Sequence, residues 1–463
     1  MHGFTSPLGV LVPLLADAVH PGWGLPFIKL VSALVSIPTV LLAAAIALHR
    51  AFRVNIWLVY LLCGYLALEH HQILWGMAGM ETQIAVFTLF LAMYHALQRN
   101  ARALGVAMAL CVGARPDFVI FLAFVALYLL LTDWKVLRTS LPLALALYAP
   151  WAVFTTLYYG SPVPNTIVAK WLGYDLWTRH VPILSQAGLE TIWLRAGYIF
   201  IPLGPFYGGH GAGFQRFIDE GVVSRVALVA MLLGAAAMLH RFHRFYIVVL
   251  GGVAAFSFYY IFFVHHMFGW YLVPFSALAW LLLTLGMGAI VNQVVLPSRM
   301  NLVGGVACVG FLLPFLIVLP VTFRADRNVQ RYIEPLRRDI GLYLRDHKKP
   351  GDRVGCEPLG NIAYYSGMPV YDYPGLANAA VTGFLKNNPQ RRNMRSMLAH
   401  FQPEWIVLRP QEYEKLLAFP EMRFLETGYT MEKVFRADPA GVAQVFRAGN
   451  NIDQCFFLLK KRG

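Results

Sequence analysis

Residues 30–53 read LVSALVSIPTVLLAAAIALHRAFR, in which nineteen uncharged residues are followed by a basic turn. A helix rises about 1.5 Å per residue, so a run of this length can cross the hydrocarbon core of a bilayer. The same alternation of apolar run and short turn recurs through most of the chain. It predicts a polytopic α-helical membrane protein with about ten transmembrane helices. The candidate spans are 27–49, 55–72, 82–98, 103–114, 117–133, 139–158, 222–240, 245–264, 270–293 and 302–321.

Composition changes sharply near residue 324. The 463 residues are 58% hydrophobic and only 13% charged, whereas soluble domains carry about 25% charge. Residues 324–463 nevertheless hold more than half of the Lys and Arg and more than half of the Asp and Glu. We therefore expect a transmembrane domain over 1–323, with a long loop at 159–221, and a soluble domain over 324–463.

The soluble segment has the alternation of an α/β domain. Residues 331–347 have helical periodicity, and residues 353–356 and 405–408 are strand candidates. We expect the Gly/Pro-rich residues 359–375 to form turns. The segment has no glycine-rich phosphate loop, so a nucleotide site is not expected. Cys356 and Cys455 would permit a disulfide in an oxidising compartment, and two free buried thiols are equally consistent with the sequence.

The net charge is +14, and many of the cations lie singly in short turns between the apolar runs. A nucleic-acid binder needs instead a basic face on a soluble fold. The basic turns alternate with turns that carry few cations, so the positive-inside rule places the basic set in the cytoplasm. The long loop and the soluble domain then lie outside. The basic turns are 49–53, 99–102, 135–138, 241–244 and Arg299.

Ionisable groups gather at the opposite, outer ends of the candidate spans. Charged groups at membrane depth are costly and usually functional, which predicts a site for an anionic lipid headgroup on that face. The groups are Glu69, His70, His71, Glu81, Arg115, Asp117, His265 and His266, with Lys170 in the long loop.

Each group also has a structural interpretation that stays open. Glu81 could cap the next helix, and Arg115 could pair with Asp117 across Pro116. The histidine pairs could be interfacial anchors, and Lys170 could extend its ammonium group toward water. No residue spacing predicts a metal site, and no cofactor is expected, although a divalent metal is left open.

Six short strings, in order along the chain, resemble motifs of GT-C glycosyltransferases, and most closely those related to the mycobacterial terminal arabinofuranosyltransferases. Residues 3–8 (GFTSPL) resemble "GYTSPL", 79–82 (GMET) resemble "G-(M/L)-E-T", and 114–117 (ARPD) resemble "(T/A)RP(D/E)". Residues 158–170 (YYGSPVPNTIVAK) resemble "YYGxPLPNTxxAK", and 270–274 (WYLVP) resemble "(W/R)YxxP". In the soluble domain, residues 360–376 resemble "GxxxYYSGxxVxDxxGL".

The resemblance implies an inverting transfer of a sugar from a polyprenyl-phosphate donor to a glycan or lipid acceptor outside the cytoplasm. It implies a multi-pass protein of the bacterial inner membrane. Cations should neutralise the leaving phosphate, and a carboxylate should act as general base on the acceptor hydroxyl. The donor-side candidates are Arg115, Lys170, Asn165, His265, His266 and Tyr271.

In the family, the base lies in an outer loop upstream of the "GYTSP" segment, whereas this sequence starts at Met1-His2. We therefore expect a transferase lacking that loop to be inactive unless Glu81 or Asp117 substitutes for the base. Two other classes stay open: a transporter or flippase of lipid-linked precursors, and a non-catalytic paralogue. Transporters favour internal repeats and helices broken at the bilayer midplane, and no repeat relates the two halves here.

The orientation can be tested with reporter fusions. A reporter fused at Gly463 should be active outside the cytoplasm, because each basic turn lies on the cytoplasmic side. Fusions between Arg99 and Arg102 should report the cytoplasm. A cytoplasmic signal from the Gly463 fusion would reverse the whole topology.

Overall fold

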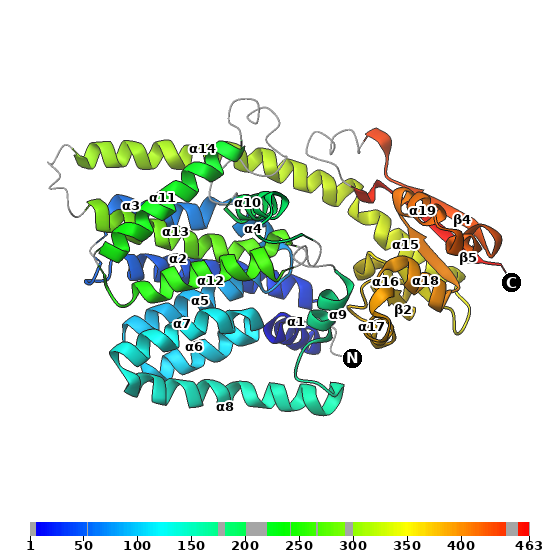
Figure 1. Cartoon of the computed structure of the whole chain (residues 1–463), viewed down its shortest axis with the longest axis horizontal. Helices are drawn as coiled ribbons and strands as arrows, with labels where there is room; N and C mark the ends of the chain where they lie inside the picture. Colours follow the sequence, from blue (N-terminus) through cyan, green and yellow to red (C-terminus); the bar gives the residue numbers. More distant parts are fainter. Residues whose placement is uncertain are drawn as a thin grey trace. The chain divides into compact units, whose positions relative to one another are not determined.

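The computed structural model describes residues 6–52, 54–174, 181–200, 220–240, 242–264, 267–291, 300–440 and 452–462. These residues form two compact units (Figure 1). The helical unit comprises residues 6–154 and 176–320. The tail unit comprises residues 321–463 together with 155–175, so a short piece of the long loop folds with the soluble domain.

Each of the ten candidate spans contains helix within the described residues, and the mostly helical fold class with a C-terminal α/β region is confirmed. The helices of this part of the chain are α1 (Pro7–Val19), α2 (Gly24–Ala47), α3 (Ile56–Leu68), α4 (His70–Met77), α5 (Thr82–Leu97), α6 (Ala101–Ala114), η1 (Pro116–Phe118), α7 (Val119–Thr132), α8 (Trp134–Tyr159), α10 (Gln186–Phe200), α11 (Glu220–His240), α12 (Tyr246–Phe262), α13 (Gly269–Val291) and α14 (Met300–Tyr332). Helices α8 and α14 continue from the helical unit into the tail unit.

Among the described residues, α2, α8 and α13 are each long and apolar enough to cross a membrane alone. Helices α4 and α5 together pass the same test, as a broken span bent by 116°. The remaining apolar stretches within the described residues are 10–17 residues long, including Leu228–His240 of α11 and Gly304–Ile317 of α14. On α2, large side chains at helical spacing stay exposed, and a lipid-facing surface has this character. They are Leu30, Leu34, Ile37, Leu41 and Leu48.

Helix α13 is the centre of the helical unit. It packs against α3, α5, α11 and α12, and nearly all of its spanning stretch is buried inside the protein. Its backbone approaches that of α11 at Gly286 and Gly234. A Cβ atom added to Gly286 would lie 2.5 Å from the Cα of Gly234, so a larger residue would push the helices apart. Small residues at such crossings are typical of membrane helix packing.

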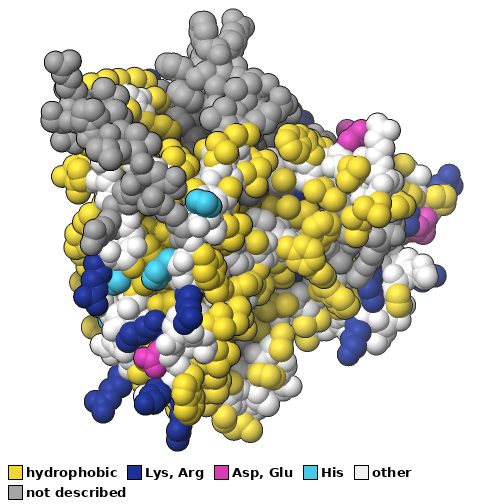
Figure 2. Space-filling view, turned by 60° about the vertical axis from the view of Figure 1, so that its left-hand side comes forward, with side chains coloured by type: hydrophobic (Ala, Val, Ile, Leu, Met, Phe, Trp, Pro, Cys, Tyr) yellow, Lys and Arg dark blue, Asp and Glu magenta, His cyan; other side chains and the backbone are white. Residues whose placement is uncertain are grey.

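The basic turns share one end of the helical unit. Figure 1 shows the turns that follow α2, α5, α7 and α11 at its left-hand end, and the breaks that follow α3, α6 and α12 at the other end. Figure 2 brings the left-hand side forward and shows Lys and Arg side chains gathered there, with hydrophobic side chains over much of the remaining surface. This separation is the arrangement that the positive-inside rule requires of a multi-pass membrane protein.

The tail unit is built on a five-stranded mixed sheet of order β2-β1-β3-β5-β4. The strands are β1 (Val354–Cys356), β2 (Val370–Asp372), β3 (Trp405–Leu408), β4 (Tyr429–Arg436) and β5 (Cys455–Lys461). Strands β2, β1 and β3 are parallel, whereas β5 is antiparallel to both β3 and β4. Around the sheet lie α9 (Asn165–Gly173), α15 (Glu334–His347), α16 (Leu359–Ser366), α17 (Ala379–Asn387), η4 (Pro389–Arg391), α18 (Met394–Phe401), α19 (Pro410–Leu417), η5 (Pro420–Met422), α20 (Phe424–Thr427) and η7 (Ile452–Gln454).

Both faces of the sheet are buried. Trp405 and Val407 of β3 belong to a cluster with α15 and α16, whereas Ile406 and Leu408 belong to a second cluster with α17 and α18. Successive strand side chains point to opposite faces, so a strand covered on both sides reads as a continuous apolar run. That is why residues 405–408 could be predicted as a strand from the sequence.

One expectation for the tail needs correction, and one open alternative is resolved. Residues 359–375 are not all turns, because α16 and β2 lie within them. Gly367 ends α16 in the left-handed conformation (φ 57°), so the glycine marks a helix terminus inside a helix–strand unit. Cys356 and Cys455 are free thiols. Strand β3 separates their strands, and two strand spacings of about 4.8 Å exceed the reach of a disulfide.

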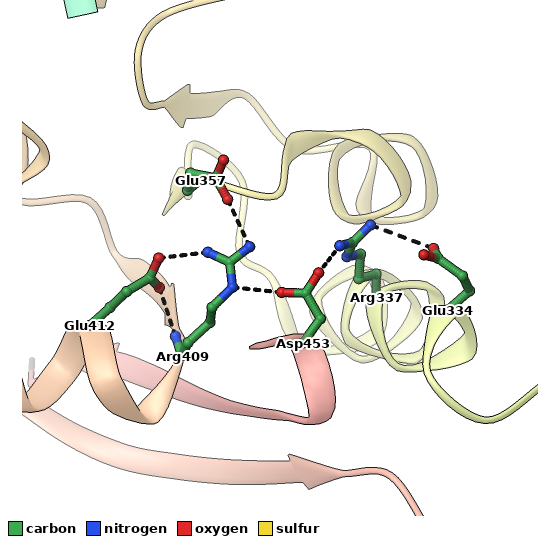
Figure 3. Close-up of polar contacts among 6 residues, drawn as sticks. All are labelled: Glu334, Arg337, Glu357, Arg409, Glu412 and Asp453. Atoms are coloured by element: carbon green, nitrogen blue, oxygen red, sulfur yellow. Dashed lines mark hydrogen bonds and ion pairs between the residues drawn. The ribbon is translucent and has the colours of Figure 1, made fainter. Parts of the chain in front are cut away.

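A network of charged side chains closes one end of the sheet (Figure 3). The Arg409 guanidinium donates to Asp453 (Nε–Oδ1 2.5 Å), Glu412 (Nη1–Oε1 2.5 Å) and Glu357 (Nη2–Oε2 2.8 Å). Arg337 donates to the other oxygen of Asp453 and, at 3.5 Å, to Glu334. Arg409 is 8% exposed and Asp453 6%. A charge buried to this extent is stable only when it is paired, so each side chain stabilises the other.

The network predicts a large cost for losing its centre. Arg409→Ala should destabilise the tail by about 3 kcal/mol, because it leaves the buried Asp453 carboxylate without its main partner. Arg409→Lys should recover only part of the loss, since one ammonium group cannot replace the planar fork that meets three carboxylates. Thermal unfolding of the full chain in detergent, read out by proteolysis of the tail, measures both variants.

The matched control is Arg345→Ala. Arg345 pairs with Asp346 with both side chains more than half exposed, so its removal should change stability by less than about 0.5 kcal/mol. Equal losses from Arg409→Ala and Arg345→Ala would contradict the central role of Arg409.

Candidate functional site

Arg115 lies where α6 ends, at the end of the helical unit opposite the basic turns. Its backbone is extended (φ −149°, ψ 114°) because the next residue is Pro116, which disfavours a helical conformation at the position before it. Asp117 follows in η1. The guanidinium donates to this carboxylate in bidentate fashion, Nε–Oδ1 3.0 Å and Nη2–Oδ2 2.7 Å. The Arg115 side chain is 9% exposed and that of Asp117 18%.

Two further helices complete the surroundings of this pair. From α12, the Tyr260 hydroxyl donates to Asp117 Oδ2 at 3.2 Å. From α13, the Trp270 carbonyl lies 3.4 Å from Arg115 Nη1, and the Tyr271 ring lies 5.0 Å from the guanidinium carbon. The structure therefore brings together Arg115, Asp117 and Tyr271, three of the residues predicted from the sequence.

Glu81 does not cap α5, since its side chain makes no capping hydrogen bond there. Its carboxylate lies instead against the first turn of α1, where an added Cβ on Gly9 would be 2.8 Å from Oε2. The same turn is tied to the end of α6, because the Ser6 hydroxyl donates to the Gly113 carbonyl at 3.2 Å. The Glu81 carboxylate therefore lies beside the N-terminal turn of α1.

A second buried carboxylate lies at the start of α4. Glu69 is fully buried and accepts from the backbone N–H groups of His71 (2.8 Å) and Gln72 (2.6 Å). The His71 Nδ1 atom lies 3.5 Å from Glu69 Oε1. Glu69 therefore supplies acceptors to N–H groups that the first turn of a helix leaves without intrahelical partners.

Sequence reasoning missed several residues of this end of the helical unit. Arg195, on α10, donates to the carbonyls of Tyr260 (2.8 Å) and Val264, where α12 ends. Gln72 donates to the Val273 carbonyl at 3.0 Å, and Gln83 donates to the Gln72 carbonyl at 2.5 Å. The polar side chain of each residue, within or beside an apolar run, could have identified it as a candidate, because polar groups at membrane depth need partners.

The remaining predicted residues lie elsewhere. Asn165 and Lys170 are on α9, in the tail unit, so the predicted headgroup site that includes both Arg115 and Lys170 stays a prediction. His265 and His266 lie outside the described residues. Within the described ranges, no three His, Cys, Asp or Glu side chains are grouped in a way that could hold a metal ion.

Asp372 is a further buried carboxylate, at the end of β2. Its oxygens accept from the backbone N–H groups of Leu376 (2.5 Å) and Ala377 (3.2 Å). Burial raises its pKa to about 6, and the backbone hydrogen bonds oppose that shift. At neutral pH the carboxylate is therefore largely ionised and shapes the loop that follows β2.

Comparison with known proteins shows the fold. ArnT from Cupriavidus metallidurans, bound to undecaprenyl phosphate, aligns with a TM-score of 0.50 at 11% identity over 99% of this chain and 88% of that chain. The apo state of the same protein gives 0.51 at 12% identity, over 98% and 87%. The oligosaccharyltransferase from Archaeoglobus fulgidus gives 0.51 at 12% identity, over 91% of this chain and 62% of that chain. Both proteins are GT-C glycosyltransferases, so this chain has an ArnT-like fold.

Sequence comparison is less informative. A family model described as a domain of unknown function, DUF8728, matches residues 324–451. No curated protein matches the chain.

The Arg115–Asp117 pair predicts a specific pattern of stability. Asp117→Asn should destabilise the chain by about 2–4 kcal/mol, because Arg115 would keep a buried charge with no compensating carboxylate. The double variant Arg115→Met with Asp117→Asn should lose less than the sum of the single variants, since it removes both charges. Melting temperatures of the chain in detergent measure the cycle.

Arg244→Ala is the control for this cycle, because Arg244 is exposed in a basic turn and, within the described ranges, donates to the Leu131 carbonyl. It should leave the melting temperature nearly unchanged. Strictly additive losses at Arg115 and Asp117 would show that the two groups do not depend on one another.

Proposed function

We propose that this chain is a GT-C membrane glycosyltransferase that transfers a sugar, with inversion, from a polyprenyl-phosphate donor to a glycan or lipid acceptor outside the cytoplasm. The observation that carries the proposal is the likeness to ArnT, which extends over 99% of the chain and so over both units. One of those ArnT structures holds undecaprenyl phosphate, the lipid carrier class that the motifs of this chain also imply.

Arg115 is the best supported cation on the donor side. A leaving phosphate gains negative charge as the glycosidic bond breaks, and a fixed cation stabilises that charge without reorganising. Asp117, Tyr260 and Tyr271 hold the guanidinium in one orientation. Lys170 supplies a second cation in our proposal. Asn165, His265 and His266 stay donor-side candidates on the resemblance alone.

Glu81 is the better candidate for the general base. Both oxygens of Asp117 accept from Arg115, and one also accepts from Tyr260, so that carboxylate is already committed to its neighbours. A base must reach the acceptor hydroxyl within about 2.6–3.2 Å, directly or through one water. Glu81 lies beside the first turn of α1 and is only half-buried, which leaves its carboxylate closer to solvent than that of Glu69.

The proposed donor class rests on the sequence motifs, and the proposed orientation rests on the basic turns. The six strings favour a donor of the kind used by arabinofuranosyltransferases. The basic turns at one end of the helical unit favour a site, and a tail unit, on the side away from the cytoplasm. We propose the bacterial inner membrane as its location on the resemblance of the motifs alone.

Transfer activity tests the proposal. Membranes containing the chain, supplied with a labelled polyprenyl-phosphate sugar and a glycan acceptor, should release polyprenyl phosphate and form a product of inverted anomeric configuration. Lys170→Ala should lower kcat/KM by about 100-fold through loss of charge on the phosphate. Glu81→Gln should lower kcat by 100-fold or more, because a general base contributes about 10²–10⁴.

Lys135→Ala serves as the control, since Lys135 is exposed at the start of α8, at the end of the helical unit opposite Arg115. It should transfer sugar at the wild-type rate. A wild-type chain that binds donor but forms no product with any sugar would overturn the proposed activity.

A further inference from the structure

Helix α9 and the loop that follows β2 are about 200 residues apart in sequence but pack together within the tail unit. The α9 face formed by Thr166, Ala169 and Leu172 is buried, at the spacing of one helical face. Leu172 belongs to the apolar cluster on the α17 side of the sheet, with Val381 and Leu385. This helix is therefore part of the core of the tail unit.

Polar contacts at Asn165 and Gly173 hold both ends of α9, and we call these contacts the clamp. At its start, Asn165 Nδ2 donates to the Gly375 carbonyl at 2.8 Å, and Asn165 Oδ1 lies 3.0 Å from the Thr382 hydroxyl. At its end, the Tyr373 hydroxyl donates to the Gly173 carbonyl at 2.5 Å. The carboxamide of Asn165 thus donates one hydrogen bond to the Gly375 carbonyl and accepts one from the Thr382 hydroxyl. An apolar side chain could make neither.

The loop that makes these contacts is itself held in shape. The buried Asp372 carboxylate accepts from the N–H groups of Leu376 and Ala377, which turns the Gly375 carbonyl toward Asn165. Packing at the other end is equally tight. A Cβ atom on Gly173 would lie 2.0 Å from the Cβ of Pro374, so only glycine fits there.

We infer that the tail domain uses this clamp to present Lys170 to the lipid phosphate, with Asn165 as a positioning residue. The inference rests on the proposed function, which gives Lys170 its role. Lys170 lies between the two clamped ends and is half-buried. A lysine ammonium group is a point charge on a flexible stem, so fixing its helix is the means by which the protein can place it.

The clamp is tested without any activity measurement. In the full chain in detergent, hydrogen exchange of the α9 amides should be about tenfold faster in Asn165→Ala, because the start of α9 loses its hydrogen bond to the Gly375 carbonyl. Asn165→Asp keeps the size but loses the donor, and it should behave similarly. Asn387→Ala, at an exposed position of the same unit, is the matched control and should leave this exchange unchanged.

Binding of undecaprenyl phosphate tests the link to Lys170. Asn165→Ala should weaken binding about tenfold, and Lys170→Ala should weaken it at least as much. In the Lys170→Ala background, Asn165→Ala should have almost no further effect, because it acts through that lysine. A residue that served only the stability of the tail would weaken binding in both backgrounds alike.

The outcomes separate the two ideas. Unchanged α9 exchange in Asn165→Ala would overturn the clamp, and additive binding losses would overturn the positioning of Lys170. A chain that binds the lipid phosphate with the expected coupling, yet transfers no sugar, would support this inference and overturn the proposed activity. A wild-type chain that does not bind the lipid would overturn both.

Discussion

An unpaired charge at membrane depth is too costly to keep, and this cost governs the helical unit. Arg115 is 9% exposed, and it is tolerated because Asp117 accepts from it through two hydrogen bonds and Tyr260 supports the same carboxylate. The pair can form because Pro116 stops α6, which lets the chain turn back so that residues two apart face each other. A helix break therefore supplies the geometry that makes a buried cation stable.

The same logic explains why the polar groups of the helical unit gather at one end. Each break leaves N–H and C=O groups without intrahelical partners, and in an apolar environment these must find side chains. Glu69 supplies acceptors at the start of α4, Ser6 at the start of α1, and Arg195 supplies donors at the end of α12.

In the tail unit, the carboxyl ends of the parallel strands are where α/β proteins commonly bind ligands. Here the protein's own side chains fill that edge: Glu357 follows β1, Asp372 ends β2 and Arg409 follows β3. Their carboxylates and guanidinium are paired with one another or with backbone groups. The edge acts as a structural support, and the loop that Asp372 shapes holds α9, which carries one of the motifs shared with GT-C enzymes.

The division into an apolar helical part and a C-terminal α/β part could be predicted from the sequence, because apolar length, flanking charge and charge content are local properties. The strand at 405–408 and the Arg115–Asp117 pair could also be predicted, because both depend on residues that are neighbours in sequence. The folding of α9 with the tail could not be predicted, since its contacts join residues about 200 positions apart. Helix α16 was missed because its glycines suggested turns, and burial of its apolar face against α15 outweighs that local preference. The roles of Tyr260, Arg195 and the Asp453 carboxylate likewise depend on partners that only the packed structure brings within hydrogen-bonding distance.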